Sequence, residues 1–344
     1  MRSSMKMTAI VTASLTVGIS LAACSSGGGS NVSAANDTAG GKSVTAKFAV
    51  LQNSGTPTAN SALKFASLVS ADTGGSVTIK VYPNSVLGSA DAQLEGTEAN
   101  TIQFYSTPTL DSVVPSVDAI ELPYLFPNAN VASKVLNGSA LQGPLWSNFP
   151  AKGLRVLGVW EVGFSDFLTT GKKVTAPTDL KSLRIRVFNP KLATEEYKLV
   201  GADAINLSSN EVVTALSTHT IDGADDPPST MVGANWYSQA KYLAVTDTSY
   251  VSSPIVVSEK FWQSLSSSQQ QGIQKAVQST IASNLAAAGQ ANTSGVAKMK
   301  SAGITVTTPD KSAWQSTFAP VTQQFQQEFP AVVKALQSAT KADS

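Results

Sequence analysis

Cysteine and histidine are almost absent from this sequence, which has one residue of each among 344. One cysteine cannot form an internal disulfide, and a Cys/His zinc site cannot be assembled from the two residues. A Ser-His-Asp triad would have to use His219, which follows an amphipathic run ending near Leu216. We interpret His219 as a solvated residue in the last turn of a helix, where the helix dipole favours it.

An excess of charge of either sign is also missing, since 24 Lys and Arg face 23 Asp and Glu. No basic surplus is available to neutralise a nucleic-acid backbone, and no block of one sign predicts a patch that binds a membrane surface. We therefore expect no nucleic-acid partner. The 42% of apolar residues and the length are enough for a sizeable core and predict two domains.

Residues 1–23 have the pattern of a secretion signal. Arg2 and Lys6 precede an apolar stretch that is too short to remain as a membrane span, and small residues follow it. Leu21-Ala22-Ala23-Cys24 resembles the bacterial lipobox, in which the cysteine is acylated. A cleaved signal with a chance cysteine nearby is the alternative. Because Cys24 is the only cysteine, we expect a lipoprotein whose sole membrane attachment is this lipid.

Residues 24–45 are rich in Ser, Gly, Ala and Asn. Such a composition cannot bury apolar surface, so we expect a flexible tether between the lipid and a globular body.

Strand and helix patterns alternate from residue 46 onward. Period-2 and helical patterns predict strands over 47–51, 77–82 and 101–105, and helices over 58–70 and 90–98. This order predicts a mainly parallel sheet covered by helices, with a site beyond the carboxyl ends of the strands. The residues that follow the third strand would then lie at a crevice, although an ordinary strand-to-helix loop is equally compatible with them: Tyr105, Ser106 and Thr107.

A second unit begins near residue 154 and includes a strand over 183–187. Ser208 with Glu211, and later Ser267 with Gln270, have the spacing of capping boxes that open helices. The second helix would run to about residue 300, and thirty helical residues span about 45 Å. We expect a helix of this length to brace two lobes.

Arg186 is the residue most suggestive of a binding site. It lies inside an apolar strand, with Arg184 on the same face. A buried guanidinium needs an anionic partner, either internal or bound. Pattern alone favours an internal salt bridge and leaves three candidate acids open: Asp222, Asp225 and Asp226.

An ordered series of segments resembles the TRAP-type (tripartite ATP-independent periplasmic) solute-binding proteins of the DctP-like family. Residues 179–187 (DLKSLRIRV) resemble the family's DLKGLKIRV segment, and residues 121–126 (ELPYLF) resemble its LPFLF segment. Further similar segments follow in the family's order: residues 82–84 with 87–89, 201–202, 211–216, 221–224, 241–243 and 260–262. The resemblance covers about residues 45–335.

The resemblance implies a two-lobed α/β fold like that of periplasmic binding proteins, with mainly parallel sheets, hinge strands and a long bridging helix. We expect one lobe over 46–163 plus about 252–291. The other lobe, with the C-terminal helices, is expected over 164–251 plus about 292–340.

The resemblance also implies binding residues. The arginine that matches Arg186 typically pairs with a ligand carboxylate through two hydrogen bonds, and Asn189 matches a position that often adds another. Ser165 or Asp166 stands where many members have a second arginine, and Asp226 stands where an asparagine is common. Ser209 completes the candidate set together with the crevice residues, Tyr105, Ser106 and Thr107.

The implied function is capture of a small organic acid by lobe closure and its delivery to the membrane subunits of a TRAP transporter. Because the second arginine of many members is missing here, we expect a ligand with one carboxylate plus hydroxyls or a cationic group. A sugar acid, a hydroxy acid or a zwitterion fits this description. Asp226 could instead simply neutralise an arginine. A binding protein for an ATP-driven transporter or a sensor, and an exported enzyme, are the alternatives. We expect no cofactor, no metal and no catalytic residue.

Overall fold

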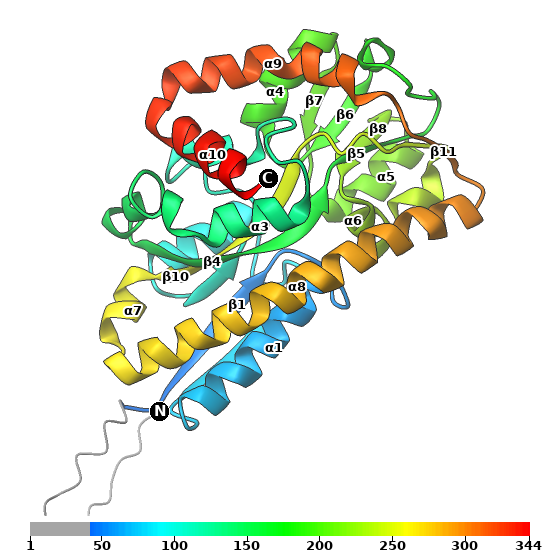
Figure 1. Cartoon of the computed structure of the whole chain (residues 1–344). Helices are drawn as coiled ribbons and strands as arrows, with labels where there is room; N and C mark the ends of the chain where they lie inside the picture. The colour runs from blue at the N-terminus through cyan, green and yellow to red at the C-terminus, as the bar shows by residue number, and fades with distance from the viewer. Residues whose placement is uncertain (1–41) are drawn as a thin grey trace, which may run out of the picture. The chain divides into compact units, whose positions relative to one another are not determined.

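The computed structural model describes residues 42–344, which contain two β-sheets covered by helices (Figure 1). The predicted signal, Cys24 and most of the predicted tether lie outside the described residues. We call each sheet with its covering helices a lobe. No helix within residues 42–344 has the length and apolar character needed to cross a membrane.

The first sheet has the order β2-β1-β3-β10-β4. β1 is parallel to β2 and β3, whereas β10 is antiparallel to both β3 and β4. In chain order its strands are β1 (Val44–Val50), β2 (Val77–Tyr82), β3 (Phe104–Ser106), β4 (Leu154–Phe164) and β10 (Tyr250–Ser258).

The second sheet has the order β11-β9-β5-β8-β6-β7. β6 is parallel to β7 and β8, and β5 is antiparallel to β8 and β9. β11 is parallel to β9, so both sheets are mixed. The strands of the second sheet are β5 (Asp166–Thr169), β6 (Arg184–Val187), β7 (Asp203–Asn206), β8 (Gly223–Asp226), β9 (Tyr242–Ala244) and β11 (Thr305–Thr307).

Helices cover both sheets and follow the predicted strand-helix alternation. The first lobe contains α1 (Pro57–Asp72), α2 (Ala90–Glu98), α3 (Ala129–Asn137) and α7 (Glu259–Ser264), with the 3₁₀ helices η1 (Pro115–Glu121), η2 (Ser139–Leu141), η3 (Trp146–Asn148) and η4 (Pro150–Lys152). The second contains α4 (Pro190–Val200), α5 (Val212–Ser217), α6 (Pro228–Gly233) and α9 (Lys311–Glu328), with η5 (Pro177–Leu180), η6 (Ser209–Glu211) and η7 (Trp236–Gln239). The last helix, α10 (Pro330–Asp343), packs against α3.

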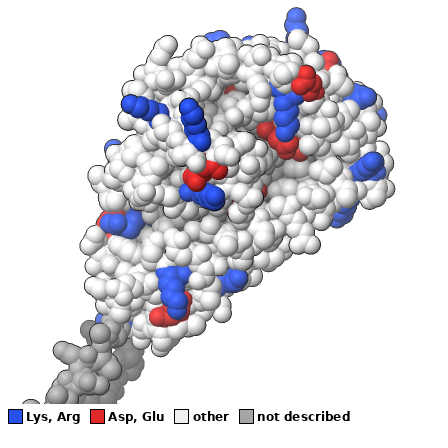
Figure 2. Space-filling model, viewed as in Figure 1, with Lys and Arg blue, Asp and Glu red and all other residues white. Residues whose placement is uncertain are grey.

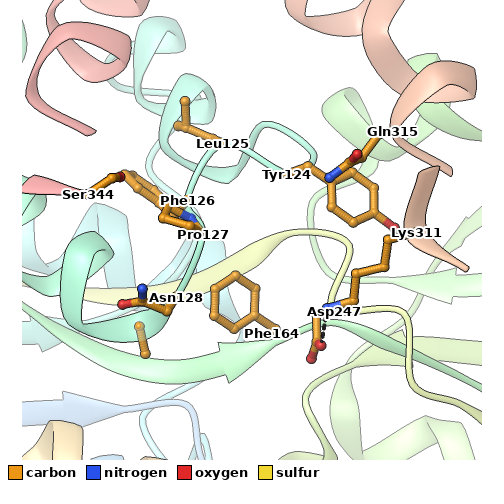
Figure 3. Close-up of a pocket in the computed structure, with 11 residues that line it drawn as sticks. Tyr124, Leu125, Phe126, Pro127, Asn128, Phe164, Asp247, Lys311, Gln315 and Ser344 are labelled. Carbon is orange, nitrogen blue, oxygen red and sulfur yellow. Dashed lines mark hydrogen bonds and ion pairs between the residues drawn. The ribbon is translucent and has the colours of Figure 1, made fainter. Parts of the chain in front are cut away.

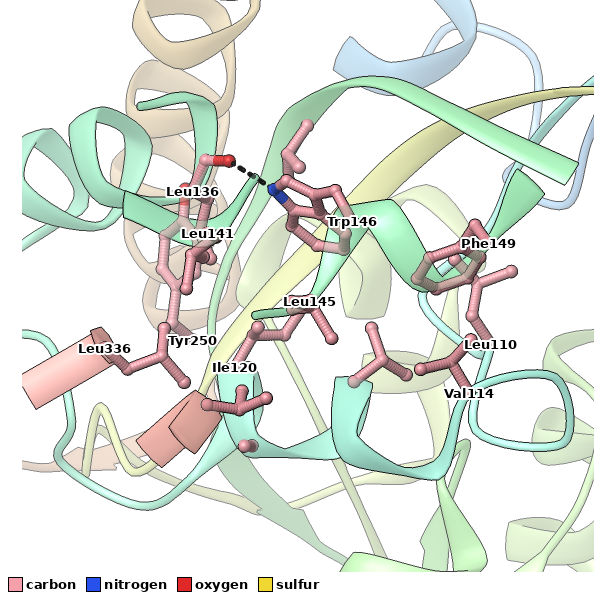
Figure 4. Close-up of a cluster of buried hydrophobic side chains, with 14 of the residues drawn as sticks. Leu110, Val114, Ile120, Leu136, Leu141, Leu145, Trp146, Phe149, Tyr250 and Leu336 are labelled. Carbon is pink, nitrogen blue, oxygen red and sulfur yellow. Dashed lines mark hydrogen bonds between the residues drawn. The ribbon is translucent and has the colours of Figure 1, made fainter. Parts of the chain in front are cut away.

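The first lobe has an apolar cluster on each face of its sheet. Figure 4 shows one of them, which includes Trp146, Leu145 and Leu141. The indole N–H donates to the carbonyl oxygen of Leu136 at 3.2 Å, so burial of the ring leaves no polar atom unpaired. Aromatic rings that meet edge-to-face or stacked fill the other cluster: Phe48, Phe65, Phe104 and Trp160.

Within residues 42–344, three segments join the two lobes before the chain passes from α9 back to the first lobe at α10. β4 continues into β5 through Ser165, and residues 245–249 lead from β9 back to β10. These two crossings bond to each other, because Ser165 N–H donates to Ser249 O at 2.9 Å and Thr248 N–H donates to Ser165 O at 3.0 Å. We call them the hinge. They confirm the predicted hinge strands.

The third connection is α8 (Ser267–Ser301), whose 35 residues span about 52 Å. It packs against α1 and β4 in the first lobe and against α6 in the second (Figure 1), which confirms the predicted bridging helix. The capping box predicted for α8, at Ser267 and Gln270, lies one residue after its position in the structure. The Ser266 hydroxyl accepts the N–H of Gln269, and the Gln269 side chain accepts the Ser266 N–H, because runs of serine and glutamine allow either register.

Candidate functional site

Arg186 lies at the carboxyl end of β6, and three different groups hold its side chain. Its Nε donates to the carbonyl oxygen of Leu207 at 3.0 Å, and its Nη1 donates to Asp226 Oδ2 at 2.7 Å. The guanidinium carbon lies 4.8 Å from the centre of the Trp236 ring. The side chains of Arg186 and Asp226 are only 5% and 8% exposed. No hydrogen bond joins Nη2 to another described residue.

The strand register explains why Arg186 and Asp226 meet. Arg186 is opposite Ala224 on the parallel strand β8. Asp226 is two residues further along β8, so its side chain is on the same face as Arg186. Burial raises the pKa of Asp226, and the positive charge of Arg186 opposes that rise.

The three acids that the sequence offers as partners of Arg186 bind three different groups. Asp222 accepts hydrogen bonds from Arg184 Nε at 3.0 Å and Nη2 at 2.9 Å, and Asp225 accepts one from the Tyr197 hydroxyl at 2.6 Å. Asp226 pairs with Arg186. Of the three candidate acids, Asp226 is therefore the one that pairs with Arg186.

Ser165 and Asp166 lie at the hinge, beside this pair. Asp166 is opposite Asp226 in the β5–β8 ladder, and its Oδ1 accepts the N–H groups of Thr246 and Asp247 at 2.9 and 3.0 Å. Burial raises the pKa of Asp166 well above its usual range, and Asp247 adds to the rise. The backbone of Ser165 bonds to the second hinge crossing. Both residues therefore hold the hinge together.

Asn189, predicted to add a hydrogen bond to the ligand, bonds to other residues of the protein. It is the N-cap of α4, and its Nδ2 donates to Asp118 Oδ1 at 2.9 Å and to Glu121 Oε2 at 3.3 Å. These acids belong to η1 of the first lobe. The side-chain amide is thus already used in a contact between the lobes.

The residues at the end of β3, predicted to lie at a crevice, are buried in this structure. Tyr105 is fully buried in the apolar core, because its ring packs there and its hydroxyl donates to Ala90 O at 3.3 Å. The hydroxyl of Ser106 bonds to that of Ser253 at 2.8 Å, and that of Thr107 bonds to that of Thr109 at 3.1 Å. None of the three forms an open crevice.

The structure thus brings five predicted residues together at the carboxyl ends of strands β6 and β8 in the second sheet. They are Arg186, Asp226, Ser165, Asp166 and Ser209, whose carbonyl accepts the Trp236 indole N–H at 3.2 Å. Tyr105, Ser106 and Thr107 belong to the first sheet and are bonded within it.

Residues 48–328 match the model of a protein family described as bacterial extracellular solute-binding protein, family 7. The chain belongs to this family. The C4-dicarboxylate-binding periplasmic protein DctP of Rhodobacter capsulatus is 28% identical over 303 residues, which cover 86% of this chain and 90% of that protein. The structure of the sugar acid binding protein DctPAm from Advenella mimigardefordensis, in complex with galactonate, is 26% identical with a TM-score of 0.83 and covers 88% and 100% of the two chains.

A TRAP periplasmic solute-binding protein from Ochrobactrum anthropi gives a similar match, at 28% identity and a TM-score of 0.79, over 88% of this chain and 96% of that one. The resemblance to TRAP-type proteins of the DctP-like family is therefore confirmed, and so is the two-lobed fold. The family's function is solute binding in transport, and its members are periplasmic, so the chain is an exported transport protein.

Sequence reasoning missed several residues around the site of this TRAP-type protein. Trp236 carries no signal, because the packing of η7 against α5 and α6 brings it to Arg186 across fifty positions of sequence. Asp118 and Glu121 could have been found, because they interrupt an otherwise apolar run that ends at Leu122. His219 lies just beyond α5 in a left-handed conformation, with φ 57°, and is exposed; it is not in the helix's last turn.

The buried charges are mostly acidic. In the part of the chain that the structure describes, Arg186 is the one basic side chain less than a tenth exposed, whereas six acidic ones are: Asp118, Glu121, Glu161, Asp166, Glu196 and Asp226. Burial raises the pKa of Glu161 to about 7. Within residues 42–344 no group of three or more His, Cys, Asp or Glu could hold a metal ion.

A cavity of about 540 Å³ borders the hinge, because its lining includes Phe164, which precedes Ser165, and Asp247, whose N–H donates to Asp166. Figure 3 shows Tyr124, Phe126 and Phe164 around it, with Lys311 paired to Asp247 at its edge. None of the predicted binding residues lines it. On the face shown in Figure 2, charged side chains are scattered singly or in small mixed groups, without a continuous patch of one sign.

Proposed function

We propose that this protein is the extracytoplasmic solute-binding component of a TRAP transporter, which closes its lobes over one small solute bearing a carboxylate and delivers it to the membrane subunits. The observation that carries this proposal is the buried guanidinium of Arg186 at the carboxyl end of β6, with Nη2 left without a partner among the described residues. A solute can close the lobes only if it binds the closed form more tightly.

The charge around Arg186 argues for a solute with a single negative charge or none. Asp226 already neutralises the arginine, and Ser165 and Asp166 add no second cation. The names of similar proteins include C4-dicarboxylates and galactonate among their ligands. We propose a sugar acid, a hydroxy acid or a zwitterion rather than a dicarboxylate, because a second carboxylate would meet uncompensated acids.

We propose further that a lipid on Cys24 holds the mature protein at a membrane. The lipobox-like segment and the Ser- and Gly-rich residues after it support this arrangement. Intact mass spectrometry of the protein from its membrane fraction tests it, because acylation adds the mass of the lipid to a chain that begins at Cys24. The proposal includes binding without turnover, so the solute should be recovered unchanged.

A calorimetric titration with galactonate, succinate and glycine betaine tests the proposed ligand class. We expect binding of galactonate or of the betaine and weaker binding of succinate. Arg186→Lys should weaken the binding by about tenfold or more, because lysine lacks the planar fork of donors. Arg184→Lys is the matched control, since that arginine is on the same strand face but pairs with Asp222.

Two outcomes contradict the proposal in different ways. Binding of succinate alone removes the proposed ligand class. Equal loss of affinity in Arg186→Lys and Arg184→Lys removes Arg186 from the binding site.

A further inference from the structure

Buried carboxyl groups lie where η1 of the first lobe meets α4 of the second. η1 contributes Asp118 and Glu121, and α4 contributes Glu196, with exposed fractions of 2%, 3% and 4%. We call these three residues the interlobe acids. They come from segments about seventy residues apart in sequence, so their proximity depends on how the lobes meet.

Asn189 links the interlobe acids to the strand that carries Arg186. Its Nδ2 donates to Asp118 at 2.9 Å and to Glu121 at 3.3 Å, and it follows Arg186 by three residues. These bonds cross from the second lobe to the first. The position of the β6–α4 loop is therefore coupled to the contact with η1.

Each interlobe acid has a buried oxygen without a hydrogen bond. These atoms are Asp118 Oδ2, Glu121 Oε1 and Glu196 Oε1. Glu196 makes no side-chain hydrogen bond to any described residue. An ionised carboxylate in such a place costs several kcal/mol, and protonation removes that cost.

The surrounding charges do not compensate the interlobe acids. Asp111 and Glu328 act on Asp118 as further negative charges, and Asp225 acts on Glu196 in the same way. The basic group that faces Asp118 is Lys191, which is exposed and lies 4.0 Å from Glu328. Burial raises the pKa of Asp118 to about 7 and those of Glu121 and Glu196 well above their usual range.

We propose that closing of the two lobes takes up protons at the interlobe acids, so that acidic medium favours the closed form. When the lobes separate, η1 leaves α4 and water reaches the carboxyl groups, which then ionise near their usual pKa of about 4. A closing step that takes up one proton becomes about tenfold less favourable per pH unit between the two pKa values. This inference goes beyond the proposed function and does not depend on the solute.

Spin labels that report the distance between the lobes test the proposal without any ligand. One label is attached at Leu63→Cys on α1 and the other at Leu199→Cys on α4, because these side chains are 56% and 44% exposed. Cys24 is replaced by serine in the same chain. We expect the ratio of closed to open molecules to fall by about tenfold between pH 6 and pH 7 if one proton is taken up.

The variant Glu196→Gln carries the decisive comparison. Because glutamine cannot ionise, closing of the lobes in this variant should take up about one proton fewer than closing in the parent protein. Glu195→Gln is the matched control on the same helix, and it should keep the parent's pH dependence. Should Glu196→Gln not fold, Asp118→Asn takes its place.

A parent protein with the same distribution of distances at pH 5.5 and pH 8 overturns the proposal. So does a Glu196→Gln variant with an unchanged response. Neither outcome affects the proposed function, since the measurement contains no solute.

Discussion

The guanidinium of Arg186 is restrained by a carbonyl oxygen, a carboxylate and an indole ring. The first two fix the direction of Nε and Nη1, and the ring of Trp236 fixes the plane of the group. This combination explains how a charged side chain is kept rigid at the end of a strand. It also leaves Nη2 of Arg186 without a hydrogen-bond partner among the described residues.

Asp226→Asn should change which charge the site accepts. The variant removes the counterion of Arg186, so the affinity for galactonate should rise by about tenfold, or about 1.4 kcal/mol, while the affinity for glycine betaine should fall. Calorimetric titration with both solutes measures the ratio of the affinity for galactonate to that for glycine betaine. Asp222→Asn is the control, because it removes the counterion of the more exposed Arg184. An unchanged ratio in Asp226→Asn would show that Asp226 does not set the charge preference.

The sequence predicts part of this site because strand alternation is local. The buried Arg186 and its three candidate acids follow from spacing alone. Which acid pairs with it depends on the register between β6 and β8, and the contact with Trp236 depends on helix packing. The bond from Asn189 to η1 could not be predicted either, since it depends on how the lobes meet.

Three elements meet at Gly163, near the end of β4. Asn292 on α8 donates from Nδ2 to Val162 O at 2.8 Å and accepts the N–H of Ser229 at 2.9 Å. This side chain therefore ties the start of the hinge to the beginning of α6. Gly163 has a φ of 147°, and a Cβ there would collide with Asn292 and lie 2.9 Å from the Cβ of Pro227.

Gly163→Ala should therefore destabilise the protein by about 1–3 kcal/mol, through crowding and lost hydrogen bonds. Urea unfolding of the two proteins measures the change in free energy. Gly171→Ala is the control, since a Cβ there meets nothing within 4 Å. Equal stability of Gly163→Ala and the parent would mean that α8 and β4 can move apart at no cost.

Elements with strong local signals are predicted well. The helix expected over 90–98 is α2, whereas the strand expected from residue 101 begins at Phe104. The difference arises because Thr101 and Ile102 donate their N–H groups to Gly96 O and close the end of α2. The antiparallel pairing of β10 leaves no local signal, since its partners are about 90 to 150 residues away in sequence.

The interior of the described part of the molecule holds more acidic than basic side chains. Burial raises the pKa of Glu161 and of Asp118 to about 7 and that of Asp166 well above its usual range. The folded protein therefore binds more protons than the unfolded chain between about pH 4 and pH 7. Its free energy of unfolding should fall as the pH rises through this window.

Urea unfolding at pH 5 and pH 8 should accordingly give the higher midpoint at pH 5. Glu161→Gln should reduce the difference in free energy of unfolding between pH 5 and pH 8. The reduction should be on the order of 3 kcal/mol for a carboxyl whose pKa rises to about 7. Glu95→Gln, at an exposed position of α2, should leave the difference in midpoint between pH 5 and pH 8 unchanged. A midpoint that rises from pH 5 to pH 8 would contradict the expected sign.

The central place of β10 in the first sheet governs when that sheet can be completed. β10 lies between β3 and β4, and its nine residues are all buried. During synthesis, β1 to β4 emerge long before their missing neighbour, so the ladder stays open until Ser258 has left the ribosome. Pairings over such sequence distances form slowly. We therefore expect the first lobe to complete its fold late in synthesis.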